Sequence, residues 1–161
     1  DDDSESGILG PFASGGLSIR GKIVSPKRPG SKTKASQEGY NLELITGRPA
    51  APHFHSWTHY SWQSQEMWPD LYVQIHPTTA KNLGVKDGAL VSIESRHGSI
   101  HARAWLYKGM RPTSVFIPIG WGERQPFSKW NSVNFLTDKT QRDPISEQTN
   151  LKSLLCRVKP I

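Results

Sequence analysis

One short segment of the chain has residue types that suit phosphate binding. Thr46-Gly47-Arg48 closes an alternating segment, Tyr40 to Thr46, whose period of two predicts a β-strand. Glycine lets a backbone approach a ligand closely, the turn can expose N–H groups, and arginine offers a planar fork of donors for phosphate. Because any β-turn can contain such a triplet, a structural turn is the first interpretation of these residues taken alone.

A second polar group gathers in the following loop. His53, His55 and His59 lie close together in the sequence, beside Ser56 and Thr58. Two imidazoles at these spacings could bind one metal ion, but no carboxylate or cysteine ligand is near, so we assign no metal ligand here. A polar loop that hydrogen-bonds a large heteroaromatic ligand, with tryptophans as packing walls, explains the same composition.

The sequence lacks the common motifs of nucleophilic catalysis and of phosphate-binding loops. No Gly-x-Ser-x-Gly elbow, P-loop or dinucleotide-fold glycine motif occurs. Cys156 is the only cysteine, which excludes an internal disulfide and a cysteine-ligated cluster built from this chain alone. We expect Cys156 to be a small buried apolar residue, and we expect the loop carboxylates Glu123, Asp138 and Asp143 to cap turns.

The charge of the chain favours an anionic partner. Lys and Arg number 20 against 14 Asp and Glu, which gives a formal net charge of +6. Nucleic acid, a membrane surface or a phosphorylated cofactor would each satisfy this charge. The six tryptophans could stack on single-stranded nucleic acid, but most of them are better explained as core and loop packing.

The pattern of residues divides the chain into a tail with a linker (1–39) and one domain (40–161). No apolar stretch is long enough for a membrane span, and no signal peptide is visible. Within the domain we expect short strands, one helix that starts at Pro77 and stops at Gly84, one helical turn, and two long loops. The predicted strands cover 40–46, 71–75, 90–94, 100–106, 115–119 and 151–158, the helix 77–83 and the helical turn 62–67. Short, evenly spaced strands predict a mostly β domain that closes into a barrel.

Several blocks of the chain, taken together, resemble the C-terminal cofactor-binding domain of the dimethyl-sulfoxide-reductase family of molybdopterin oxidoreductases. They occur in the family's order and cover roughly residues 40–159, and no single block is diagnostic. The blocks are Leu44 to Arg48, His55 to His59, Val73 to Pro77 with Ala80 and Leu83 to Gly88, Val91 to Gly98, Met110 to Pro118, Asn131 to Thr137, and Asp143 to Ser146.

The resemblance implies a six-stranded double-psi β-barrel with one or two short helices and long ligand-facing loops. It also implies a molybdenum or tungsten bis-molybdopterin guanine dinucleotide cofactor, whose phosphates and pterin edge suit arginine, hydroxyl and amide donors. The residues expected to bind the cofactor are Thr46, Gly47, Arg48, His55, Ser56, Thr58, Gly120, Trp121, Asn134 and Lys152. No catalytic residue is assigned, and the turns at Asp87-Gly88 and Arg96-His97-Gly98 are interpreted as barrel turns.

On this resemblance the chain is not a complete enzyme, because a metal ligand and cluster cysteines are missing from it. It would complete the active-site cleft of a larger catalytic chain, with iron–sulfur clusters on partner chains. The loops look closer to the polysulfide, thiosulfate, tetrathionate and arsenate reductase branch than to nitrate reductases or formate dehydrogenases. The extracytoplasmic side of a membrane-attached complex is the preferred compartment. The alternatives are a barrel that serves as an adaptor without cofactor and, more distantly, a nucleic-acid binder.

Overall fold

A computed structural model of the chain describes residues 38–49, 56–122, 129–138, 140, 142–143, 145–152 and 154–161. Of Ser56 it describes the backbone only. Residues 1–37 of the predicted tail, His53, His55 and Glu123 lie outside the described residues.

Six strands form a closed barrel in the order β1-β5-β2-β4-β3-β6. They are β1 (Leu42–Gly47), β2 (Tyr72–Ile75), β3 (Leu90–Ser95), β4 (Ser99–Leu106), β5 (Ser114–Pro118) and β6 (Leu154–Pro160). The pairs β1 with β5 and β2 with β4 are parallel, and the other neighbours are antiparallel. The prediction of a mostly β, six-stranded closed barrel is confirmed.

Among the described residues, two short α-helices and two 3-10 helices connect the strands. These are α2 (Trp62–Met67), α3 (Pro77–Leu83), η1 (Ser56–Tyr60) and η2 (Val133–Leu136). Helix α3 begins at Pro77 and ends at Gly84, whose φ of 70° gives the left-handed cap that glycine adopts without strain. Both α-helices match the predicted ranges, whereas η1 and η2 lie in stretches that were expected to be loops. No helix among the described residues is long and apolar enough to cross a membrane.

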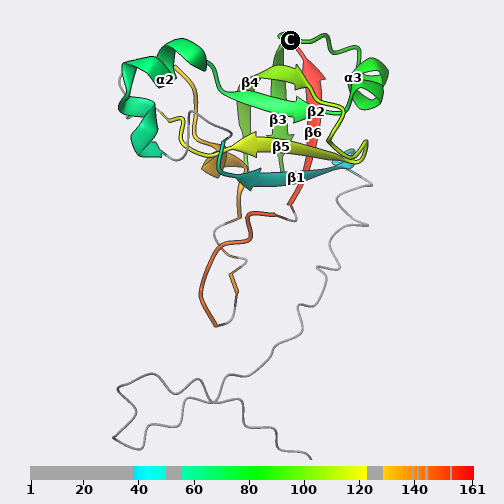
Figure 1. Cartoon of the computed structure of the whole chain (residues 1–161). Helices are drawn as coiled ribbons and strands as arrows, with labels where there is room; N and C mark the ends of the chain where they lie inside the picture. The colour runs from blue at the N-terminus through cyan, green and yellow to red at the C-terminus, as the bar shows by residue number, and fades with distance from the viewer. Residues whose placement is uncertain are drawn as a thin grey trace, which may run out of the picture. The chain divides into compact units, whose positions relative to one another are not determined.

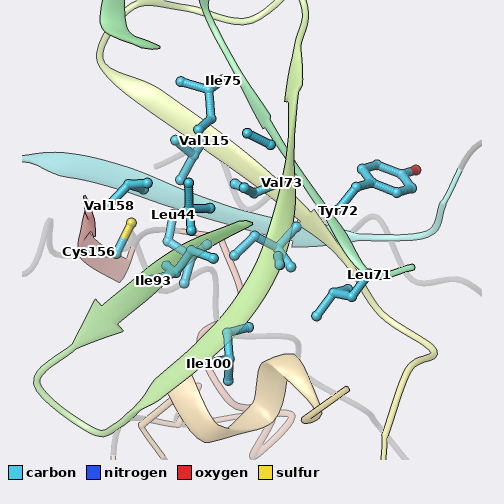
Figure 2. Close-up of a cluster of buried hydrophobic side chains, with 14 of the residues drawn as sticks. Leu44, Leu71, Tyr72, Val73, Ile75, Ile93, Ile100, Val115, Cys156 and Val158 are labelled. Carbon is cyan, nitrogen blue, oxygen red and sulfur yellow. The ribbon is translucent and has the colours of Figure 1, made fainter. Parts of the chain in front are cut away.

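Every second residue of a strand points inward, and these inward residues fill the interior of the barrel. Leu44, Val73, Ile93 and Val115 have no exposed surface, and Figure 2 shows them meeting from four different strands. Cys156 lies in the same cluster, and burial raises the pKa of its thiol to about 12. The prediction that Cys156 is a buried apolar residue is confirmed.

On the outside of the barrel, an ion pair joins β3 to β6. The Glu94 carboxylate accepts hydrogen bonds from Arg157 Nε at 2.7 Å and from Lys159 Nζ at 3.0 Å. Because both cations stabilise the charged form, they hold the pKa of Glu94 below its usual value of 4.5. These contacts stabilise the register between β3 and β6, two strands that are far apart in the sequence.

The strand directions give the barrel two distinct ends. Strands β1, β3 and β5 finish where β2, β4 and β6 begin, because the pairings make β1, β3 and β5 run in one direction and β2, β4 and β6 in the other. We call this the α2 end, since α2 leads into β2 there, and we call the opposite end, which holds α3, the α3 end. Figure 1 shows the arrowheads of β1 and β5 pointing to α2 and away from α3.

Candidate functional site

Three of the predicted site residues leave the barrel side by side at the α2 end. Arg48 follows β1, and Gly120 and Trp121 follow β5. The two strands are parallel with Gly47 opposite Pro118, and the Ile119 N–H donates to the Gly47 carbonyl at 2.8 Å. Carboxyl ends of adjacent parallel strands expose their following loops at one edge, so the two predicted loops emerge together.

Thr46 reaches inward from the same strand. Its side chain is 2% exposed, and its hydroxyl donates to the Leu151 carbonyl at 2.9 Å while its N–H donates to the same oxygen at 3.0 Å. The side chain therefore holds the segment before β6 against β1. Lys152, the next residue, is exposed, so Thr46 also sets where Lys152 leaves the barrel.

Gly47 has a packing reason for lacking a side chain. A Cβ at this position would lie 3.1 Å from Cε2 of Phe116, on the neighbouring strand β5. Such a contact is tighter than van der Waals packing normally allows, so Gly47 makes room for the Phe116 ring. The structure thus explains Gly47 by the close approach of the Phe116 ring. A contact between Gly47 and a ligand stays a prediction.

The helix η1 brings the histidine-rich loop to the Gly120-Trp121 turn. His59 is 5% exposed, and its ring meets the Trp121 ring edge to face, with centroids 4.1 Å apart. Trp121 is equally buried and also packs on Tyr72, at 5.9 Å between ring centroids. Its indole is thus interior, which leaves its backbone as the part able to face a ligand. Thr58, one residue before His59, is half-buried.

Further aromatic rings support β2 from outside the barrel. Tyr72, Trp68 and Trp105 pack together with centroid distances of 5.0 to 5.1 Å, and the indole N–H of Trp130 donates to the Asp70 carboxylate at 3.2 Å. The expectation that most tryptophans serve packing holds for these residues.

Asn134 reaches the α2 end by a different route. It lies on η2, which packs against the β3–β4 turn: Ser95 Oγ donates to the Leu136 carbonyl at 2.9 Å. A Cβ on Gly98 would stand 2.6 Å from the carbonyl oxygen of Phe135, so the turn needs glycine for η2 to approach. The Asn134 side chain is exposed. The β3–β4 turn was expected only to join two strands, but it also packs against the segment that contains Asn134.

The loop carboxylates serve turns, as expected for Asp138 and Asp143. Asp138 accepts hydrogen bonds from the Thr140 N–H at 2.7 Å and from its hydroxyl at 2.6 Å. Asp143 accepts the backbone N–H groups of Ile145 and Ser146, which holds its pKa below the usual value. Within the described residues, no group of three or more His, Cys, Asp or Glu side chains could hold a metal ion.

The α2 end therefore presents exposed donors of three kinds. Arg48 and Lys152 carry positive charge, Asn134 carries an amide, and all three are exposed, while Thr46 and Trp121 are buried. Cationic donors suit phosphate oxygens, and an amide suits the mixed donors and acceptors of a heterocycle. The residues present thus fit a phosphorylated heterocyclic ligand at this end. Ser95 and Leu151 could not be assigned to the site from the sequence, and His59 was considered there only as a possible metal ligand, because each of these residues acts through a contact that is distant in sequence.

Comparison with known proteins shows which family the chain belongs to. Residues 42–155 match the family described as "Molydopterin dinucleotide binding domain". The chain belongs to this family, and the resemblance inferred from the sequence is confirmed.

The relatives of the chain are much larger proteins, and the chain matches only a part of each. It is 31% identical over 154 residues to the assimilatory nitrate reductase catalytic subunit of Bacillus subtilis (strain 168), covering 86% of this chain and 19% of that protein. It is 32% identical over 127 residues to dopamine dehydroxylase of Eggerthella lenta, covering 74% and 12%. Acetylene hydratase from Pelobacter acetylenicus has a similar fold over 80% of this chain and 19% of its own, with a TM-score of 0.69 at 21% identity. The chain spans about a fifth or less of the length of these proteins, and its assignment to the polysulfide reductase branch stays a prediction.

Proposed function

We propose that this chain holds the molybdopterin guanine dinucleotide of a molybdenum or tungsten oxidoreductase and completes the active-site cleft of a larger catalytic chain. The observation that supports this most directly is the parallel register of β1 and β5, which opens the Arg48 and Gly120 loops at one edge. Family membership supplies the cofactor class. When bound, the cofactor supplies the redox chemistry at its metal.

The residues of this chain would bind and orient the dinucleotide. Arg48 would donate to its phosphates, with Lys152 adding positive charge beside it. The Asn134 amide and the Thr58 hydroxyl would donate to or accept from a heterocycle, together with Ser56 and His55 of the same loop. Gly47, Gly120 and Trp121 would approach through their backbones, because donors fixed on strand ends hold a ligand without reorganising. Thr46, whose N–H and hydroxyl both donate to Leu151, would support this loop from beneath the contact predicted for it.

A larger partner chain is supported by exposed apolar side chains at the α2 end. Trp57, Trp62 and Met67 on η1 and α2 are 78%, 65% and 63% exposed. Large apolar side chains gathered in one short stretch mark interaction surfaces, because their exposure to water is unfavourable. The much greater length of the relatives is consistent with a larger catalytic chain beside this one, and iron–sulfur clusters would lie on that chain or on a further subunit.

The partner surface can be tested by co-purification. Replacing Trp62 and Met67 with glutamine should reduce the amount of catalytic chain recovered with this chain. The matched control is Ile161→Gln, which changes a 69% exposed apolar residue at the α3 end. Equal recovery with both variants would contradict this surface.

The cofactor assignment is tested by metal and pterin analysis of the native complex. We expect molybdenum or tungsten and a pterin to accompany the intact, active complex, and their absence from it would refute the proposed function. Within the complex, Arg48→Ala should lower the pterin content, because it removes the phosphate donor. Arg111→Ala removes an exposed arginine at the α3 end and should leave the content unchanged.

A further inference from the structure

His59 turns inward from a helix whose other aromatic residues face outward. Its neighbours Trp57 and Tyr60 are 78% and 56% exposed, whereas His59 is 5% exposed. In a 3-10 helix of five residues one side faces the protein, and here His59 occupies that side. The histidine is thus the residue that seats η1 on the barrel.

His59 and Gly120 fit together only as a pair. The Gly120 backbone has a φ of 123°, in the region open mainly to glycine. A Cβ built on Gly120 would overlap the His59 imidazole, with Cδ2 only 2.8 Å away. The same imidazole packs edge to face with the Trp121 ring, so His59 contacts both residues of the turn after β5.

The two loops that His59 joins are each held in place by a helix or a strand. The Gln65 side-chain amide on α2 donates to the His59 carbonyl at 2.8 Å, and the Ser61 N–H donates to the Thr58 carbonyl at 3.1 Å. On the other side, the Trp121 ring packs on Tyr72 of β2. His59 therefore stands between two anchored loops that join different strands.

We propose that His59 is a positioning residue that locks η1 to the Gly120-Trp121 turn, so that two of the proposed cofactor-facing loops keep one fixed geometry. This inference rests on the proposed function for its effect on ligand binding. The positioning role needs no contact between His59 and the cofactor, because His59 acts through Gly120, Trp121 and Thr58. Loss of the imidazole would free both loops while leaving the barrel strands paired.

The packing of His59 on Gly120 is tested by a double-mutant cycle read out as the unfolding midpoint. Gly120→Ala should lower the midpoint in the wild-type background and should lower it clearly less in His59→Ala, where the overlap is relieved. The control Gly122→Ala places a Cβ 3.7 Å from the nearest atom, an ordinary contact, and should have the same small effect in both backgrounds. Equal effects of Gly120→Ala in the two backgrounds would overturn the proposed lock.

The effect of His59 on the proposed cofactor site is tested by the affinity of the full chain for guanosine diphosphate, measured by calorimetry. His59→Ala should weaken binding about tenfold, because the ligand must then order two loops that were fixed beforehand. His59→Phe, which keeps a flat ring beside Trp121, should restore most of the affinity, and His101→Ala, at an exposed position on β4, should bind as the wild type does.

The two ideas fail in different ways. If the wild-type chain does not bind guanosine diphosphate, the proposed function is at fault, and the double-mutant cycle still decides the lock. If the wild type binds and His59→Ala binds equally well, the positioning role is refuted.

Discussion

The hydrogen bonds between Thr46 and Leu151 connect the first proposed cofactor loop to the segment before β6, and Thr46→Val tests them. Valine keeps the volume and branching of threonine, so the buried site gains neither cavity nor clash, and only the hydroxyl is lost. The Leu151 carbonyl keeps the Thr46 N–H as a donor at 3.0 Å. The change therefore removes one partly buried hydrogen bond without leaving the acceptor unpaired.

Such a bond contributes about 1 kcal/mol to stability. For a domain of this size that loss corresponds to a decrease in melting temperature of about 3–6 °C. Differential scanning calorimetry measures this shift directly. Thr113→Val, at an exposed position before β5, is the matched control and should change the free energy of unfolding by less than about 0.5 kcal/mol. A Thr46→Val protein as stable as the wild type, or one destabilised no more than the control, would refute the role assigned to this hydroxyl.

Three further predictions concern charge, reactivity and backbone conformation. Glu94→Gln should cost up to about 1 kcal/mol at pH 7. Because the folded pKa of Glu94 is lowered, its contribution is complete above its unfolded pKa near 4.5 and is lost as pH falls through the folded value, so urea titrations of wild type and variant should converge in acid. The Cys156 thiol, with a pKa of about 12, should react with an aromatic disulfide at pH 8 on the order of 10³-fold more slowly than a free thiol, and rapid labelling of the native chain would contradict its burial. Gly84→Ala should destabilise the chain by about 1 kcal/mol in chemical denaturation, because its φ of 70° is strained for alanine although space is available, and an unchanged midpoint would exclude that strain.

Elements with a strong local signal could be predicted closely from the sequence. Pro77 and Gly84 mark the two ends of α3, and the alternation on either side of Arg96 to Ser99 predicts the β3–β4 hairpin. These signals depend on neighbours in the sequence, and a single residue such as proline restricts the backbone by itself. The 3-10 helices carry no comparable signal, because their few residues have no periodic pattern.

The candidate site could be predicted only in part, because its order depends on contacts between distant segments. The triplet at Thr46 and the loop at Gly120 are visible in the sequence, but their adjacency follows from the parallel pairing of β1 with β5. Likewise, nothing in the local pattern distinguishes the buried His59 from an exposed loop histidine. Its burial depends on the absent side chain of Gly120, 61 positions later in the sequence. Barrel closure thus supplies the information that local patterns lack.

The most direct test of the account is to map where the dinucleotide's nucleotide half binds. Titrating the isotope-labelled chain with guanosine diphosphate and following backbone amide resonances would locate the site residue by residue. We expect the largest changes at the α2 end, at Gly47, Arg48, Gly120 and Asn134, and none at Asp87 and Gly88 of the α3 end. Changes confined to the α3 end, or no changes at all, would contradict the claim that the α2 end of this barrel holds the cofactor.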